Sequence, residues 1–257
     1  TTDAMVYATL SKGFRPGGNN RRPGVLPFKS DTLTNYEVGV KTSFGPVTLN
    51  AAGFYQKWKD LQFGLVPVGQ NGVTNTYNAG DARIYGLEGD ISYRAGGFSL
   101  VAAGSYIDAK LTTDFCQVDP LTTNIVCVPG EAPAAAKGTR LPVQPKFKGS
   151  ATARYEFETG NIRPFVQGSV QYQGGTRSFL TDADYAVVGP TKDFTTFDFS
   201  AGVKFDSWSI QAYIQNAFDK RGELSKNSFC ATSFCGPYAR TYPIKPQIFG
   251  LKVGTEF

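Results

Sequence analysis

The four cysteines are the residues with the clearest potential for chemistry, and they form two close pairs, Cys116/Cys127 and Cys230/Cys235. The chain contains no histidine, which excludes Ser-His-Asp and Cys-His catalysis and the common histidine-bearing zinc sites. Neither pair has the C-x2-C spacing of a zinc ribbon. We therefore expect no metal site, no cofactor and no enzyme, although chemistry by carboxylates alone stays open. The better interpretation is two local loop disulfides, which implies an oxidising compartment.

The formal charge of +5 is spread along the chain. Its nearest approach to a basic cluster is Arg15, Arg21 and Arg22, which is too sparse to predict a nucleic-acid partner. No run approaches the roughly 18 apolar residues of a spanning helix, which excludes helical membrane spans. A transmembrane barrel is apolar only at every second position, so a membrane location stays open. The 29 glycines and 14% aromatic residues favour many strands and turns.

The elements that must position these residues are strands with one apolar and one polar face. In the last stretch, 246–257, Phe249, Leu251, Val253 and Phe257 lie on one side, and Gly, Lys and Glu alternate with them. This period of two predicts a strand. The pattern recurs and predicts about ten strands, at residues 3–12, 33–42, 47–62, 76–94, 98–110, 146–158, 166–172, 197–205, 208–215 and 246–257.

Short and long connections alternate between these strands. Short turns are expected near 43–46, 95–97, 158–161 and 206–207, and the other connections are loops of very different length. Such asymmetry is typical of outer-membrane barrels, which have short periplasmic turns and long extracellular loops. The C-terminus then falls on the short-turn side. One antiparallel meander covers 1–257, and no domain boundary is evident.

The apolar faces could pack on a second sheet, as in a secreted β-sandwich binding module, or contact lipid. The strands are commonly ten or more residues long, which suits a tilted membrane span. Their polar faces carry Lys, Glu, Asp, Arg and Gln, which a wet lumen accepts. Tyr, Phe and Trp concentrate near strand ends, as in an interfacial girdle. These features favour outer-membrane lipid over a sandwich.

Several segments resemble those of TonB-dependent outer-membrane receptors. They are residues 7–19 (YATLSKGFRPGGN), 78–80 (NAG) running to 85–89 (YGLEG), and 214–221 (IQNAFDKR). The last stretch, ending in Phe257, resembles the signal that the family presents to the barrel assembly machinery. The resemblance implies the outer membrane of a Gram-negative bacterium and a barrel of about 22 strands, occluded by an N-terminal plug. It also implies energy-dependent uptake of ferric siderophores, cobalamin or other scarce nutrients through the TonB complex.

The sequence departs from the family pattern because it has about ten strands, no plug and no TonB box. We expect 1–257 to be the C-terminal portion of such a barrel, without the N-terminal region that contacts TonB. The first residues run directly into a strand-like stretch, which suggests a cut edge or a mature fragment. Ten twisted strands could close as a small barrel, but these faces suit a wider lumen. The expected result is a curved sheet with unpaired first and last edges.

The leading functional hypothesis is part of an active importer of a ferric siderophore or a similar iron complex. In that interpretation, cationic and aromatic side chains meet an anionic chelate, and the candidates are Arg15, Arg21, Arg22, Arg83, Trp58 and Tyr77. Alternatively, these arginines are solvated loop charges and the aromatic residues pack against neighbouring loops. The alternative function is a passive porin or a small surface barrel.

Overall fold

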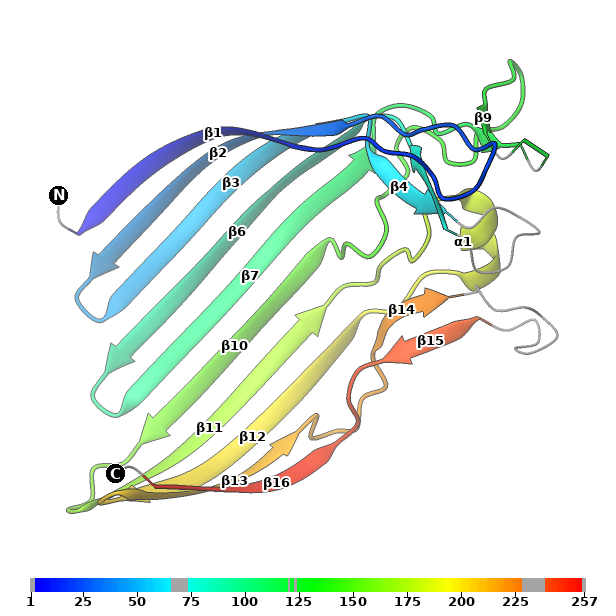
Figure 1. Ribbon diagram of the computed structural model, residues 1–257. Helices are drawn as coiled ribbons and strands as arrows, with labels where there is room; N and C mark the ends of the chain where they lie inside the picture. The colour runs from blue at the N-terminus through cyan, green and yellow to red at the C-terminus, as the bar shows by residue number, and fades with distance from the viewer. Residues whose placement is uncertain (1–2, 66–73, 120, 123, 228–238, 256–257) are drawn as a thin grey trace.

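The computed structural model describes residues 3–65, 74–119, 121–122, 124–227 and 239–255. Figure 1 shows long strands side by side in one curved sheet, with the connecting loops at one end and the turns and both termini at the other. The 10-stranded sheet has the order β1-β2-β3-β6-β7-β10-β11-β12-β13-β16, and each neighbouring pair is antiparallel. Its strands are β1 (Ala4–Arg15), β2 (Asp31–Phe44), β3 (Val47–Lys59), β6 (Ala82–Ala95), β7 (Phe98–Leu111), β10 (Phe147–Glu156), β11 (Ile162–Gln173), β12 (Phe194–Phe205), β13 (Trp208–Gln215) and β16 (Ile248–Thr255). The predicted all-β antiparallel meander is confirmed.

The short turns hold residues whose backbone must be left-handed. The φ angle is 56° at Gly45, 55° at Gly96, 58° at Gly160 and 46° at Asp206. Tight hairpin turns require positive φ, which glycine adopts without a steric cost. All these turns lie at the end of the sheet opposite the loops (Figure 1).

The loops contain structure that the sequence pattern did not indicate. Three small hairpins pair β4 (Gln62–Leu65) with β5 (Asn75–Asn78), β8 (Gln117–Val118) with β9 (Ile125–Val126), and β14 (Glu223–Asn227) with β15 (Arg240–Pro243). One helix, α1 (Asp182–Val188), is capped by Thr181, whose side chain accepts a hydrogen bond from the Asp184 backbone N–H. No helix in the described ranges is long and apolar enough to cross a membrane.

The strand expected at 76–94 is wrong in one respect, because it is two strands, β5 and β6. The chain breaks at Gly80, which has φ +87°. The backbone N–H of Asp81 then donates to Oγ1 of Thr113 at 2.8 Å instead of to a strand partner. The alternation of buried side chains changes phase at this break, from Tyr77 and Ala79 before it to Ala82 after it, so one period of two does not describe 76–94.

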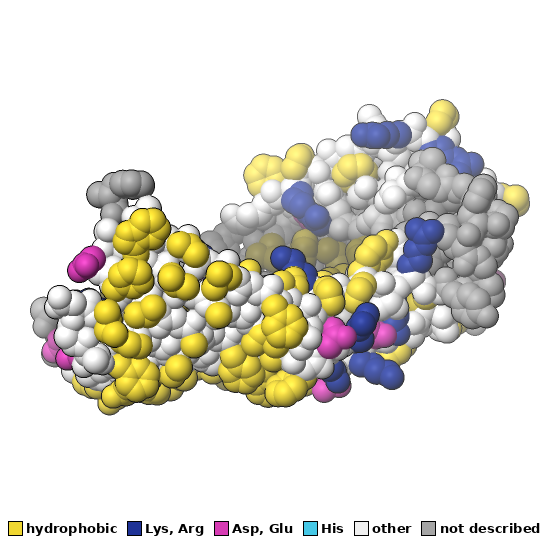
Figure 2. Space-filling view, turned by 90° about the horizontal axis from the view of Figure 1, so that it is seen from below, with side chains coloured by type: hydrophobic (Ala, Val, Ile, Leu, Met, Phe, Trp, Pro, Cys, Tyr) yellow, Lys and Arg dark blue, Asp and Glu magenta, His cyan; other side chains and the backbone are white. Residues whose placement is uncertain are grey.

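The two faces of the sheet differ as the alternation predicts. One face lines a hollow of about 1150 Å³, with Lys41, Asn50, Asp90, Lys148 and Gln171 among its lining residues. We call it the concave face, and the opposite one the convex face. On the convex face Phe147 is 53% exposed, Phe199 45% and Leu251 69%. These side chains are therefore not interlocked in a dry protein interior. Figure 2 shows hydrophobic side chains spread over the strands, with most charged ones nearer the loops.

Aromatic residues mark both ends of this apolar band. Near the loops, the tilted rings of Tyr36 and Tyr55 have centroids 6.5 Å apart, and those of Tyr106 and Phe147 are 4.8 Å apart. Near the turns, Tyr93 and Phe98 are 6.0 Å apart, and Tyr155 and Phe157 are 4.7 Å apart. Such paired girdles are typical of strands whose ends lie at the two membrane interfaces.

The main buried core lies among the loops. Its larger members include Leu61, Tyr77, Leu111, Phe115 and Leu180, all 5% exposed or less. The loop segments therefore pack on one another above the sheet. Within the described part of the chain, β1 and β16 each pair with one neighbour, so both edges of the sheet are open as expected.

Candidate functional site

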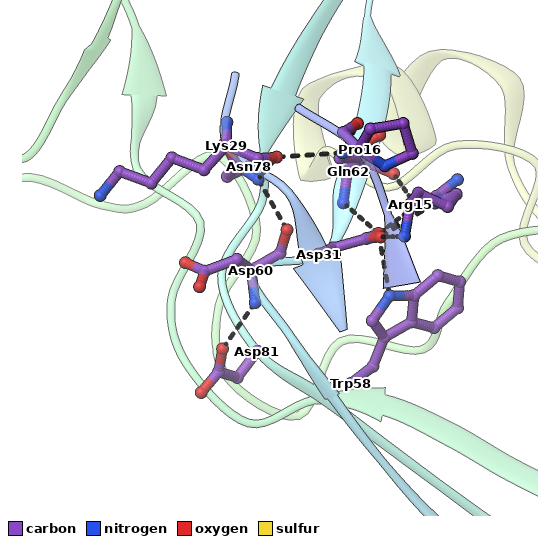
Figure 3. A network of polar contacts seen from close by, with 9 residues as sticks. All are labelled: Arg15, Pro16, Lys29, Asp31, Trp58, Asp60, Gln62, Asn78 and Asp81. Carbon is purple, nitrogen blue, oxygen red and sulfur yellow. Dashed lines mark hydrogen bonds and ion pairs between the residues drawn. The ribbon is translucent and has the colours of Figure 1, made fainter. Parts of the chain in front are cut away.

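A buried carboxylate joins the loop ends of the first three strands. Asp31, the first residue of β2, pairs in register with Arg15, the last residue of β1. Its side chain is 2% exposed and forms an ion pair with the guanidinium of Arg15. It also accepts hydrogen bonds from Nε1 of Trp58 at 2.9 Å and from the backbone N–H of Gln62 at 3.1 Å. Figure 3 shows these groups converging on Asp31.

The same cluster fixes the first long loop. The amide Nε2 of Gln62 donates to the carbonyl oxygens of Pro16 at 2.9 Å and Lys29 at 3.0 Å. Asn78 accepts from the backbone N–H of Lys29 at 2.7 Å and donates to the carbonyl of Asp60 at 2.7 Å (Figure 3). Both ends of the loop 16–30 are therefore held against the β4–β5 hairpin. Asp31, Gln62 and Asn78 form what we call the loop clamp.

Two of the candidate ligand residues belong to this clamp. Besides its ion pair, Arg15 donates from Nη2 to the Gln62 carbonyl at 3.0 Å, and its Cζ lies 5.2 Å from the ring centroid of Trp58. The guanidinium and the indole N–H are thus engaged by protein groups. This arrangement supports the alternative in which they hold neighbouring loops together.

Arg21 and Arg22 lie exposed in the loop 16–30. Tyr77 is 5% exposed, and its hydroxyl accepts from Nδ2 of Asn75 at 3.2 Å. Burial raises the pKa of Tyr77, while the charge of nearby Arg22 opposes this rise. The structure therefore brings Arg22 near Tyr77, with the cation exposed and the ring within the loop core.

Arg83 is not brought together with these residues. It lies in β6 with the parity of Tyr85 and Leu87, on the convex face, and its Cζ is 5.6 Å from the ring centroid of Tyr85. The concave face has other polar contacts. Tyr7 donates to Glu37 at 2.9 Å, and Asn50 donates to Asp90 at 2.9 Å.

The predicted disulfide between Cys116 and Cys127 is present, with an 11-residue separation. It closes the loop that carries β8 and β9. Cys230 and Cys235, like the terminal Phe257, lie outside the described residues.

Sequence reasoning gave no site role to Asp31 or Gln62, and it singled out Asn78 only as part of the segment 78–80. Single polar residues beside loops give no compositional signal. The usable sign is register: pairing the two strands that flank the loop 16–30 places Arg15 opposite Asp31.

Comparison with known proteins shows to which family the chain belongs. Residues 1–217 match the family model described as TonB dependent receptor-like, beta-barrel. The chain belongs to the TonB-dependent receptor family. This is a family of transport receptors for small metal chelates that work with TonB, in the outer membrane of Gram-negative bacteria.

Among similar relatives, the pesticin receptor of Yersinia enterocolitica is 28% identical over 229 residues, which are 86% of this chain and 30% of the relative. The metal-pseudopaline receptor CntO of Pseudomonas aeruginosa is 28% identical over 226 residues, covering 86% of this chain and 28% of the relative. The chain thus spans less than a third of the length of these TonB-dependent receptors.

Solved structures agree on the fold. The ferric yersiniabactin uptake receptor FyuA from Yersinia pestis has a TM-score of 0.75 at 22% identity, covering 100% of this chain and 35% of that chain. The ferric preacinetobactin receptor BauA from Acinetobacter baumannii has a TM-score of 0.68 at 14% identity, covering 98% and 34%. Both likenesses show that the sheet has the fold of a segment of these barrel walls.

Proposed function

We propose that this chain forms part of the barrel wall and loop surface of an active outer-membrane importer for a metal chelate, with a ferric siderophore as the leading candidate cargo. The observation that carries the proposal is the ten-stranded open meander, with an exposed apolar convex face and structured loops gathered at one end. The names of similar proteins, a ferric yersiniabactin uptake receptor and a metal-pseudopaline receptor, support a chelated metal as cargo. Catalysis has no part in this function.

The open edges support a larger barrel. Unpaired strands expose backbone N–H and C=O groups that lipid cannot satisfy. In this proposal further strands of the same receptor complete the wall beside β1 and β16, and an N-terminal plug fills the lumen and contacts TonB. Outer-membrane lipid surrounds the convex face, and the barrel assembly machinery reads the C-terminal strand.

In this proposal some loop residues bind the chelate and others hold the loop in position. Arg21 and Arg22 are exposed and lie on a loop whose ends are fixed, so they are the cations we assign to an anionic chelate. Arg15 and Trp58 act as positioning residues through Asp31. Tyr77 packs in the buried core of the loops.

The test is uptake of radiolabelled ferric chelates by cells that carry the full-length protein and lack other receptors. Active import predicts accumulation that stops when a protonophore collapses the proton-motive force. Accumulation that continues unchanged would favour the passive porin. The R21A/R22A variant should weaken chelate binding, with K137A as the matched exposed-loop control.

A further inference from the structure

The strand register places a row of cations on the convex face. Across five neighbouring strands the register partners are Lys12, Thr34, Lys57, Arg83 and Lys110. We call the four cations of this set the basic row. Directly opposed side chains lie on one face at close spacing, so Lys57, Arg83 and Lys110 form a strip of positive charge. Lys12 lies on the same line beyond Thr34.

The position of the strip relative to the apolar band is fixed by the same register. Two residues nearer the turns, the matching positions are Leu10, Tyr36, Tyr55, Tyr85 and Asp108. Leu10 is 72% exposed, Tyr36 45% and Tyr55 39%. The basic row therefore lies just beyond the aromatic girdle, between the apolar band and the loops, at the depth of lipid headgroups.

Most of this charge has no counterion among the residues that the structure describes. Asp108 is 4% exposed, forms an ion pair with Lys110 at 3.0 Å and accepts from the Tyr85 hydroxyl at 3.0 Å. Lys12, Lys57 and Arg83 are exposed. Within the described part of the chain, these three have no ion pair with a carboxylate.

The cations of the basic row lie on β1, β3, β6 and β7. In β10, β11, β12, β13 and β16, which are described over their whole lengths, the convex positions alternate through residues such as Ala151, Val170, Phe199, Ile210 and Leu251. None of the convex positions in these strands is charged. These positions lie nearer the turns than the basic row, because β10 begins at Phe147, opposite Tyr106 and four residues from Lys110. The row therefore borders an uncharged band on its turn side.

We propose that the basic row binds the phosphate-bearing headgroup of an anionic lipid in the surrounding leaflet. Like charges opposite one another are destabilising until an anion neutralises them. A guanidinium flanked by ammonium groups suits a phosphate, and the aromatic row beneath suits the acyl chains. This inference concerns the lipid face and holds whatever the cargo of the importer is.

The test measures lipid binding by native mass spectrometry on the full-length protein, titrated with short-chain phosphatidylglycerol or phosphatidylcholine. Each surface cation contributes about fivefold to anionic lipid affinity, so the wild type should prefer phosphatidylglycerol by tenfold or more. K12Q/K57Q/R83Q should lose the preference, and R83Q alone should lose about fivefold. The matched control K137Q/K220Q/K245Q, at exposed loop cations, should retain it.

Heat-modifiable migration on gels checks that every variant is folded, and R83Q alone keeps the test valid if the triple variant fails this check. Two results would overturn the proposal. One is an equal preference for phosphatidylglycerol in R83Q and the wild type. The other is displacement of the bound lipid by equimolar inorganic phosphate, which would indicate a site for free anions.

Discussion

The indole Nε1 of Trp58 donates a 2.9 Å hydrogen bond to Oδ2 of Asp31. Trp58 lies near the end of β3, and Asp31 opens β2. The bond therefore closes the loop end of a hairpin whose turn lies at the opposite end of the sheet. With the ion pair from Arg15, it makes one carboxylate the junction of three strands.

Asp31→Asn should destabilise the protein by about 2–3 kcal/mol, because a buried charged acceptor loses its charge-assisted bonds. Asp182 provides the matched control. It also pairs with an arginine, Arg177, but its side chain is 56% exposed. Asp182→Asn should change stability by less than about 1 kcal/mol. Urea unfolding in detergent micelles measures both, and equal midpoints for the two variants would show that the loop clamp does not stabilise the fold.

The Cys116–Cys127 disulfide should restrain its loop. Closing 11 residues removes about 3 kcal/mol of loop-closure entropy from the unfolded chain. C116S/C127S should therefore make residues 112–140 a preferred site of limited proteolysis while the sheet stays protected. Alkylation of the unreduced native protein should modify none of its four cysteines. Mass detection of free thiols would contradict this pairing.

The contribution of Asp219 should depend on pH. The backbone N–H of Gln247 donates to the Asp219 carboxylate at 3.1 Å. This hydrogen bond is the main cause that lowers the pKa of Asp219 from 3.8, and the charge of Arg221 lowers it further. A lowered folded-state pKa means stabilisation that is present above pH 3.8 and lost as the pH falls through the folded value. The stability difference between the wild type and Asp219→Asn should therefore shrink in acid. A stability difference that is the same at pH 7 and pH 2 would contradict this role of Asp219.

Lysine scanning should distinguish the two faces of β10. Ala151 lies on the convex face and Ser150 on the concave face, where it lines the hollow. Ala151→Lys should cost about 2–4 kcal/mol in a lipid bilayer, because a charge near the midplane meets hydrocarbon. Ser150→Lys should cost less than about 1 kcal/mol. Comparable losses from unfolding in liposomes would mean that both faces have the same environment.

The sequence period predicted the strands well because side-chain alternation is strict when two faces meet different media. It missed the division between β5 and β6 at Gly80, where the alternation changes phase between buried Ala79 and buried Ala82. It also missed α1, whose 7 residues are too short to show a helical period. The loop clamp joins residues far apart in the chain, such as Asp31 and Gln62, and no local pattern reports such contacts.

The most direct test of this account is the environment of alternate residues along β10. Spin labels on cysteines introduced at Ser150, Ala151, Thr152 and Ala153 of the full-length protein would be exposed to oxygen, which concentrates in hydrocarbon, and to a water-soluble nickel complex. We expect oxygen to relax the labels at 151 and 153, and nickel those at 150 and 152. Protection of all four labels from both reagents would place this strand in a packed protein interior and contradict the account.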